Sequence, residues 1–415
     1  MYRSFKLNIF SILLVFAMLY LSQPAMSFLF YIPFVYCINL ASSKKFLLNP
    51  YSLFSITIFS IIIYNPIFSS FLITIPNDIY LIIFLGIISF LIGMIIADKI
   101  GETKKSNEKI NIRILQKKSF WIVLFLGIIP HFIGYINVGI PILNLENIAE
   151  LRANYLPDGL SYFTFFLPLT ILIAYQNKNK RLIIISIIIN AVVSLIKVAK
   201  FDVLIFLMFI LYSNIKYSQK TKISKNYLST IGAVLTIPFI FDWFYSLRND
   251  LDSVNSDYFL SNTDSFINSA VSLPYLYFTS SWSNLTQTIS TVNEFNYGVY
   301  TLFPFISAFQ MDHLINYYSI KTIYIHPFNT FAFLTDYYMD FGVIGVIIFP
   351  FLTGLLVMNA YKRSIISSNP IKDGQFLILG IATLMLFFSN HFTSVGYPFI
   401  VYILYGIIGR LIKVN

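Results

Sequence analysis

Cysteine and charged residues are both scarce in this chain, and each scarcity excludes a class of protein. There is one cysteine among 415 residues, which excludes a disulfide framework and a cysteine-based metal site. Only 11% of the residues are charged, whereas 57% are hydrophobic and the mean hydropathy is +0.75. A soluble domain cannot bury that much apolar surface. The composition therefore predicts a polytopic membrane protein without a separate soluble domain.

Patterns for metal or nucleic-acid binding are also missing. The four histidines show no metal-ligand spacing, and Asp250-Leu-Asp252 is too short a match to the D-x-D metal pattern to indicate a site. We therefore expect no metal and no other cofactor. The net charge is +10, but no basic run is interleaved with aromatic residues that would stack on bases. We expect no nucleic-acid partner, because the lysine clusters lie at helix ends, where they orient a membrane protein.

Apolar runs of about 17–25 residues, the length needed to cross a bilayer, dominate the sequence. We predict an all-α polytopic membrane protein with about twelve transmembrane helices. These spans are 7–22, 24–41, 51–70, 79–97, 119–137, 160–176, 182–196, 203–215, 228–246, 341–360, 375–390 and 396–411. The first run also resembles a signal peptide, but the region after Pro24 is a poor cleavage site. We expect that run to be retained as a helix.

The stretch 182–215 is the least regular part of this pattern. As a single helix it would be about 51 Å long at 1.5 Å per residue, against a hydrocarbon core of about 30 Å. Two short helices joined at Lys197-Val-Ala-Lys200-Phe-Asp202 fit better. A single helix would also move the lysines that follow residue 215 to the opposite side of the membrane and break the charge pattern.

The basic residues predict the topology. With both termini on the inner side, all but five of the 28 lysines and arginines lie in inner connections, as the positive-inside rule requires. The chain then divides into helices 1–246, one large outer loop 247–340, and helices 341–415. The exceptions on the outer side are Arg152, Lys197, Lys200, Arg248 and Lys321.

Four of these outer cations are candidates for a phosphate or pyrophosphate site. Lys197 follows the first short helix and Lys200 precedes the second. Because both helices are short, this junction lies close to the hydrocarbon core, where an unpaired charge is costly. Asp202 can neutralise only one of them, so an anion site and a structural pair both remain open. Arg152 and Arg248 either bind a phosphate through their planar donors or pair locally with neighbouring carboxylates. Lys321 is interpreted as a solvated surface charge.

The large loop contains a helical pattern just after Pro274. Large apolar side chains recur on one face, with Ser, Thr, Asn and Gln on the other. We interpret this segment as a helix that lies on the membrane by its aromatic face. The same mixture of aromatic and neutral polar groups would also suit carbohydrate. The apolar face consists of Tyr275, Phe278, Trp282, Leu285 and Ile289.

The end of the loop gathers His326, Asn329, Asp336 and Asp340 directly before the tenth predicted span. The histidine or one of the carboxylates could act as a general base toward a sugar hydroxyl. For the two aspartates the alternative is a favourable interaction with the start of a helix. The other histidines near outer span ends, His131 and His391, are expected to be structural.

The sequence Asn329-Thr-Phe, followed by Asp336-Tyr-Tyr-Met-Asp340-Phe-Gly342-Val-Ile-Gly345, resembles the end of the large periplasmic loop of Wzy-type O-antigen polymerases, the oligosaccharide repeat unit polymerases. The basic junction between two short spans and the run from Gly298 to Phe303 are similar as well. Some members carry an Arg-x10-Gly pattern, which is absent here because position 163 is Phe.

The resemblance implies a metal-independent glycosyltransferase of the bacterial inner membrane, with both termini cytoplasmic. It would join undecaprenyl-pyrophosphate-linked oligosaccharide units on the periplasmic face, with a chain-length regulator protein as a further candidate partner. The implied site residues are Arg152, Arg248, Lys197 and Lys200 for the pyrophosphate, His326, Asp336 or Asp340 as the base, and Asn329 and Tyr337 for the glycan.

Two alternatives remain. An O-antigen ligase shares the layout and differs only in its acceptor. A lipid-linked oligosaccharide flippase or other non-enzymatic transporter would not need a long loop on one face. Ion-coupled transport also requires acidic residues within the spans, which are nearly absent here.

Overall fold

The fold is all-α, as predicted. A computed structural model describes residues 27–43, 48–64, 72–100, 117–144, 150–151, 154–156, 159–217, 266–309, 311–323, 330–367, 369–395 and 397–412. Within these ranges there is no β-strand, and an isolated parallel bridge joins Phe331 to Ser389. Four helical segments are long and apolar enough to cross a membrane: 77–100, 118–143, 334–366 and 370–387.

Every predicted span that falls on described residues contains helical structure. Spans 7–22 and 228–246 lie outside the described residues, and each of the others overlaps an observed helix. The elements are η1 (Ser27–Phe30), α2 (Tyr31–Ser43), α3 (Pro50–Ile62), α4 (Asn77–Ile100), α5 (Lys117–Val138), η2 (Pro141–Leu143), η3 (Leu160–Phe165), α7 (Phe166–Gln176), α8 (Lys180–Ile196), α9 (Lys200–Tyr217), α11 (Phe266–Thr291), α12 (Val299–Ala308), η4 (Asp312–Leu314), α13 (Leu334–Ile366), α14 (Pro370–Leu384), η5 (Met385–Phe387), the π-helical turn η6 (His391–Val395) and α15 (Tyr397–Leu411).

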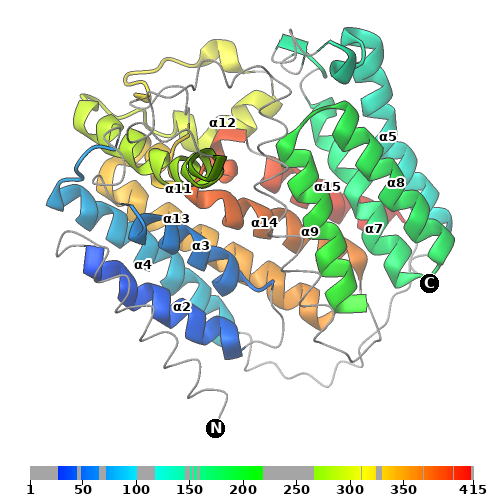
Figure 1. Ribbon diagram of the computed structural model, residues 1–415, viewed down its shortest axis with the longest axis horizontal. Coiled ribbons are helices and arrows are strands. Elements are labelled where there is room, and N and C mark those ends of the chain that lie inside the picture. The colour runs from blue at the N-terminus through cyan, green and yellow to red at the C-terminus, as the bar shows by residue number, and fades with distance from the viewer. Residues whose placement is uncertain are drawn as a thin grey trace.

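Two groups of helices lie side by side in Figure 1. In the first group α2, α3 and α4 pack with α13, and α11 and α12 lie over one end. The second group contains α5, α7, α8, α9 and α15. Helix α14 connects the groups, because it contacts α3 and α13 on one side and α7, α9 and α15 on the other.

Helices α4 and α13 form the closest pair, and two glycines bring their backbones together. A Cβ atom on Gly93 would lie 2.1 Å from the carbonyl oxygen of Phe351. A Cβ atom on Gly354 would lie 2.2 Å from the carbonyl oxygen of Phe90. Small residues that permit backbone contact are a general means of helix association in membranes, where the hydrophobic effect does not drive helices together.

The break predicted within 182–215 is confirmed. Helix α8 ends at Ile196 and α9 begins at Lys200. Between them Val198 adopts a positive φ of 51° and is fully buried. A β-branched residue in this region is strained, so the surrounding packing must hold the turn.

The expectation that the helix after Pro274 lies on the membrane surface is wrong. The segment is helical, as part of α11, but on its aromatic face Trp282 and Leu285 are buried within the protein, and Tyr275, Phe278 and Ile289 are half-buried. Trp282 is fully buried and its indole nitrogen donates to Ser60 Oγ at 3.0 Å, while Ser283 Oγ lies 2.6 Å from the hydroxyl of Tyr64. The opposite face is buried too, at Thr279, Ser280, Ser281, Asn284, Thr286 and Thr288.

The tenth predicted span, 341–360, lies within α13, but helical structure begins earlier than that span. Helix α13 begins at Leu334, so Asp336 and Asp340 belong to a helix and not to the preceding loop. The helix is bent at Gly342, whose φ of 59° and ψ of −144° are not helical. The apolar pattern alone missed the first turns because they carry two aspartates and two tyrosines.

We expect Gly354→Ala to destabilise the protein by about 1–3 kcal/mol, because the added methyl group overlaps the Phe90 carbonyl and must push α4 from α13. Thermal unfolding in a neutral detergent measures this loss of stability. Gly406→Ala is the matched control, since its Cβ would meet only the flexible amide end of Gln375, at 3.2 Å. Equal unfolding midpoints for the two variants would contradict the close packing.

Candidate functional site

The bend at Gly342 exposes backbone carbonyls that the loop before α12 then engages. The amide of Asn296 donates to the Met339 carbonyl oxygen at 2.9 Å, and the amide of Tyr297 donates to the Asp340 carbonyl oxygen at 3.1 Å. Only glycine readily adopts the dihedral angles of residue 342. The bend thus joins the segment before α12 to the first turns of α13.

Asp340 completes this junction with its side chain. Its two carboxylate oxygens accept hydrogen bonds from the backbone amides of Tyr300, at 3.1 Å, and Thr301, at 2.5 Å. These amides lie in the first turn of α12, where donors have no partner within the helix. Asp340 is fully buried and acts as an N-terminal cap supplied from another helix.

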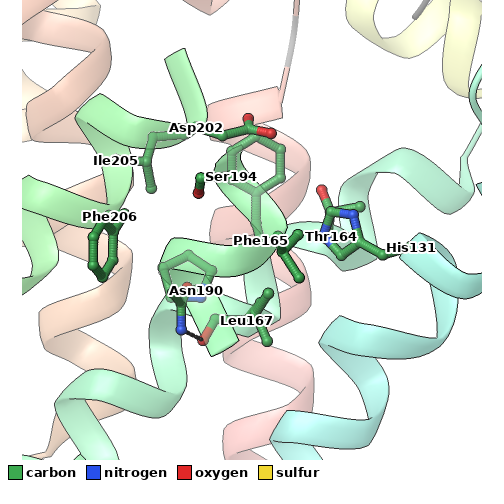
Figure 2. Close-up of a pocket in the computed structure, with 11 residues that line it drawn as sticks. His131, Thr164, Phe165, Leu167, Asn190, Ser194, Asp202, Ile205 and Phe206 are labelled. Atoms are coloured by element: carbon green, nitrogen blue, oxygen red, sulfur yellow. Dashed lines mark hydrogen bonds between the residues drawn. The ribbon is translucent and has the colours of Figure 1, made fainter. Parts of the chain in front are cut away.

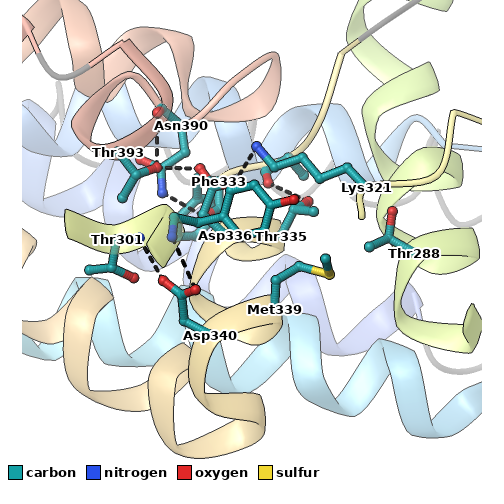
Figure 3. A network of polar contacts seen from close by, with 12 residues as sticks. Thr288, Thr301, Lys321, Phe333, Thr335, Asp336, Met339, Asp340, Asn390 and Thr393 are labelled. Atoms are coloured by element: carbon teal, nitrogen blue, oxygen red, sulfur yellow. Dashed lines mark hydrogen bonds and ion pairs between the residues drawn. The ribbon is translucent and has the colours of Figure 1, made fainter. Parts of the chain in front are cut away.

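Asp336 lies one turn earlier on α13 and has different partners (Figure 3). Lys321 forms an ion pair with one carboxylate oxygen, and the hydroxyl of Thr393 donates to the other. The Asp336 side chain is 2% exposed and that of Lys321 is 16% exposed. The Lys321 ammonium also lies 4.8 Å from the centre of the Tyr300 ring, within cation–π range.

The interpretation of Lys321 as a solvated surface charge is therefore wrong. Its ammonium is enclosed by Asp336, Tyr300 and Phe331. One feature of the sequence points to a paired lysine: Lys321 is the one lysine between residues 247 and 340. The sequence does not reveal which of the loop's acidic residues pairs with it.

Two segments hold Asp336 in place. Residues 330–333 run in extended form between α11 and the turn after α14, with the amides of Phe331 and Phe333 donating to the carbonyls of Phe388 and Leu386. Asn390 then donates to the Phe333 carbonyl at 2.8 Å, and Thr393 also contacts the Asn390 carbonyl at 3.2 Å. The carboxylate of Asp336 is thus positioned by the chain on both sides.

A second polar cluster surrounds the junction of α8 and α9. Lys197 forms an ion pair with Asp202 at 2.7 Å, and its ammonium lies 5.5 Å from the centre of the Tyr155 ring. The Tyr155 hydroxyl is 3.2 Å from His131 Nδ1. The predicted pairing of Asp202 with one lysine is confirmed. Lys200 begins α9, and its side chain lies outside the described residues.

A small cavity of about 30 Å³ adjoins this cluster. Figure 2 shows Asp202, His131 and Asn190 around it, together with Phe165 and Phe206. Asn190 donates to the carbonyls of Leu167 and Ser186. A volume of this size holds about one water molecule, so the cavity is too small for a sugar or a phosphate group.

The turn η6 links the two clusters. Thr393, within the turn, contacts Asp336, whereas His391, at its start, stacks on Phe201 with ring centres 4.9 Å apart. Phe201 immediately precedes Asp202. Burial lowers the pKa of His391 to about 4, so the ring is neutral at pH 7. Neither ring nitrogen has a hydrogen-bond partner among the described residues. π-helical turns occur frequently at functional sites.

The remaining predicted site residues divide into two groups. Arg152, Arg248, His326 and Asn329 lie outside the described residues. Tyr337 is described and is buried. Its ring stacks on Phe349 with centres 5.3 Å apart, so a glycan would reach it only if the surrounding helices separated.

In the part of the chain that the structure describes, no group of three His, Cys, Asp or Glu side chains is placed to hold a metal ion. No known protein family, curated protein or solved structure matches the chain. The polar clusters of this structure are therefore the observations on which a function has to rest.

We expect Asp340→Ala to destabilise the junction of α12 and α13 by about 1–3 kcal/mol, because two backbone amides lose a buried acceptor. Hydrogen exchange of the Tyr300 and Thr301 amides measures the local effect and should become faster. The control is Glu294→Ala, which removes an exposed carboxylate from the same segment and should change stability by less than about 0.5 kcal/mol. Unchanged exchange in Asp340→Ala would contradict the capping role.

Proposed function

We propose that this protein is a membrane glycosyltransferase that polymerises undecaprenyl-pyrophosphate-linked oligosaccharide units on the periplasmic face of a bacterial inner membrane. The observation that carries the proposal is the buried contact of Asp336 with Lys321 and Thr393. It lies within the segment whose sequence resembles the Wzy-type polymerases. A carboxylate beside a cation, both withdrawn from water, supplies the two groups that such a transfer needs.

In the proposed reaction a hydroxyl oxygen of the acceptor unit attacks the anomeric carbon of the donor chain. The bond between that carbon and the pyrophosphate oxygen breaks, and undecaprenyl pyrophosphate leaves with the bonding electrons. Asp336 accepts the proton of the attacking hydroxyl. Lys321 stabilises the negative charge that develops on the leaving group, and Lys197, Lys200, Arg152 and Arg248 are the further cations proposed for the pyrophosphate.

Lys321 connects proton acceptance by Asp336 with stabilisation of the leaving pyrophosphate. While it is paired with Asp336, the ammonium occupies one oxygen of that carboxylate. An incoming pyrophosphate, with more negative charge than a carboxylate, competes for the ammonium. When Lys321 turns to the pyrophosphate, one oxygen of Asp336 loses its partner and becomes free to accept a proton. Substrate binding would in this way prepare the base.

The proposal assigns the base to Asp336 and not to Asp340. Both oxygens of Asp340 are engaged by backbone amides that cannot move without unwinding α12. The partners of Asp336 are side chains, which can rotate. His326 is retained as the alternative base.

We expect Asp336→Asn to reduce elongation of purified lipid-linked repeat units by about 100- to 10,000-fold, the range for loss of a general base. Lys321→Gln should give a comparable loss. Glu294→Gln, an exposed carboxylate outside the site, is the control and should elongate normally. Normal elongation by Asp336→Asn, with the protein folded in the membrane, would transfer the role of base to another residue such as His326.

Deleting the gene distinguishes a polymerase from a ligase. Loss of a polymerase leaves surface molecules capped with a single repeat, because single units are still transferred. Loss of a ligase removes the surface chains and accumulates polymer on the lipid carrier. We expect the single-repeat pattern when the surface polysaccharide is separated by length. An unchanged ladder would contradict both enzymatic functions.

A further inference from the structure

A cavity of about 480 Å³ lies between the ends of α13 and α15 and the start of α14. Three cationic side chains line it: Arg363 from α13, Lys372 from α14 and Arg410 from α15. Neutral polar groups lie between them, since Gln375 donates to the Tyr402 carbonyl at 2.8 Å and Arg363 donates to the Tyr402 hydroxyl at 3.3 Å. The volume falls within the range of about 300–1,000 Å³ that is typical of ligand sites.

Among the described residues, the lining of this cavity carries positive charge only. None of the described residues that line it is acidic. The nearest carboxylate in the sequence, Asp373, is fully buried and points to the other side of α14. There it forms an ion pair with Lys216 at 2.5 Å and accepts a hydrogen bond from the Tyr212 hydroxyl at 3.1 Å. The three cations are exposed, so an incoming phosphate group can reach all of them from outside the protein.

The walls of the cavity continue into apolar surface. On α15, Ile403 and Ile407 line the cavity and are about half exposed, and Leu411 beyond them is exposed as well. On α13, Ile365 and Ile366, two and three residues after Arg363, are exposed. Such side chains suit contact with acyl chains and not with water. Gly406 and Gly409 of α15 also line the cavity.

We propose that this basic cavity binds the headgroup of an anionic phospholipid, with the acyl chains lying along α15. The three cations recognise the phosphate, and the exposed isoleucines contact the chains. Basic pockets between transmembrane helices are established sites for acidic lipid headgroups. The site is separate from Asp336 and Lys321 and does not depend on the proposed transferase activity. Under the predicted topology it faces the cytoplasmic leaflet.

The test uses the full-length protein in neutral detergent, titrated with phosphatidylglycerol while thermal unfolding is followed. We expect the unfolding midpoint to rise with phosphatidylglycerol and not with phosphatidylcholine. Each of Arg363→Gln, Lys372→Gln and Arg410→Gln should weaken the apparent affinity about fivefold, and the triple variant on the order of a hundredfold. Lys99→Gln, an exposed charge at the end of α4, is the matched control and should bind as the parent does.

Two further arms distinguish the possible sources of the phosphate. Inorganic phosphate and glycerol 3-phosphate carry the recognised group without acyl chains, and we expect neither to reproduce the shift at equal concentration. An equal shift with either would overturn a lipid site in favour of a soluble ligand. Photo-crosslinking with a phosphatidylglycerol probe should label α15 around Ile403 and Ile407. An unaltered affinity in the triple variant, or labelling confined to other helices, would overturn the proposal.

Discussion

The need to satisfy backbone polar groups inside an apolar bundle determines the architecture around the bend of α13. An unpaired carbonyl or amide there is costly, because no bulk water can replace the missing partner. The bend at Gly342 leaves two backbone carbonyls without helical partners, and the amides of Asn296 and Tyr297 donate hydrogen bonds to them. The Asp340 carboxylate accepts hydrogen bonds from backbone amides in the first turn of α12. Residues before α12, α12 itself and α13 are therefore one unit, and this unit presents Asp336 to Lys321.

The same requirement explains why α11 packs inside the protein although its pattern predicts a helix on the membrane surface. A helix with an aromatic face and a hydroxyl-rich face is typical of a membrane surface, and α11 has that pattern. Its polar groups instead form hydrogen bonds inside the protein. The Trp282 indole donates to Ser60, and the Asn284 amide donates to the Thr330 carbonyl. Neutral polar side chains can be buried at low cost when each has a partner. Periodicity along one segment cannot reveal partners that lie far away in the sequence.

Features encoded locally were predictable from the sequence. The helix 160–176, the break before Lys200 and the pairing of Asp202 with a neighbouring lysine all follow from apolar length and the cost of isolated charge. The start of α13 was not predictable in this way, because Asp336 and Asp340 interrupt the apolar pattern while their partners come from Lys321, Thr393 and α12. The sequence identified both aspartates as candidates, and the tertiary contacts give them different partners.

A buried ion pair is a poor source of stability, because the loss of hydration offsets much of the attraction between its charges. An apolar pair of similar size would fill the space around Lys321 and Asp336 without that loss. Asp340 by contrast supports the fold through hydrogen bonds to an otherwise unpartnered helix end. The two carboxylates lie one turn apart on α13, and Asp336 joins that helix to Lys321 and to Thr393 of η6. The partners of Asp336 are side chains that can rotate away, whereas those of Asp340 are backbone amides, and the proposal that Asp336 is the base rests on this difference.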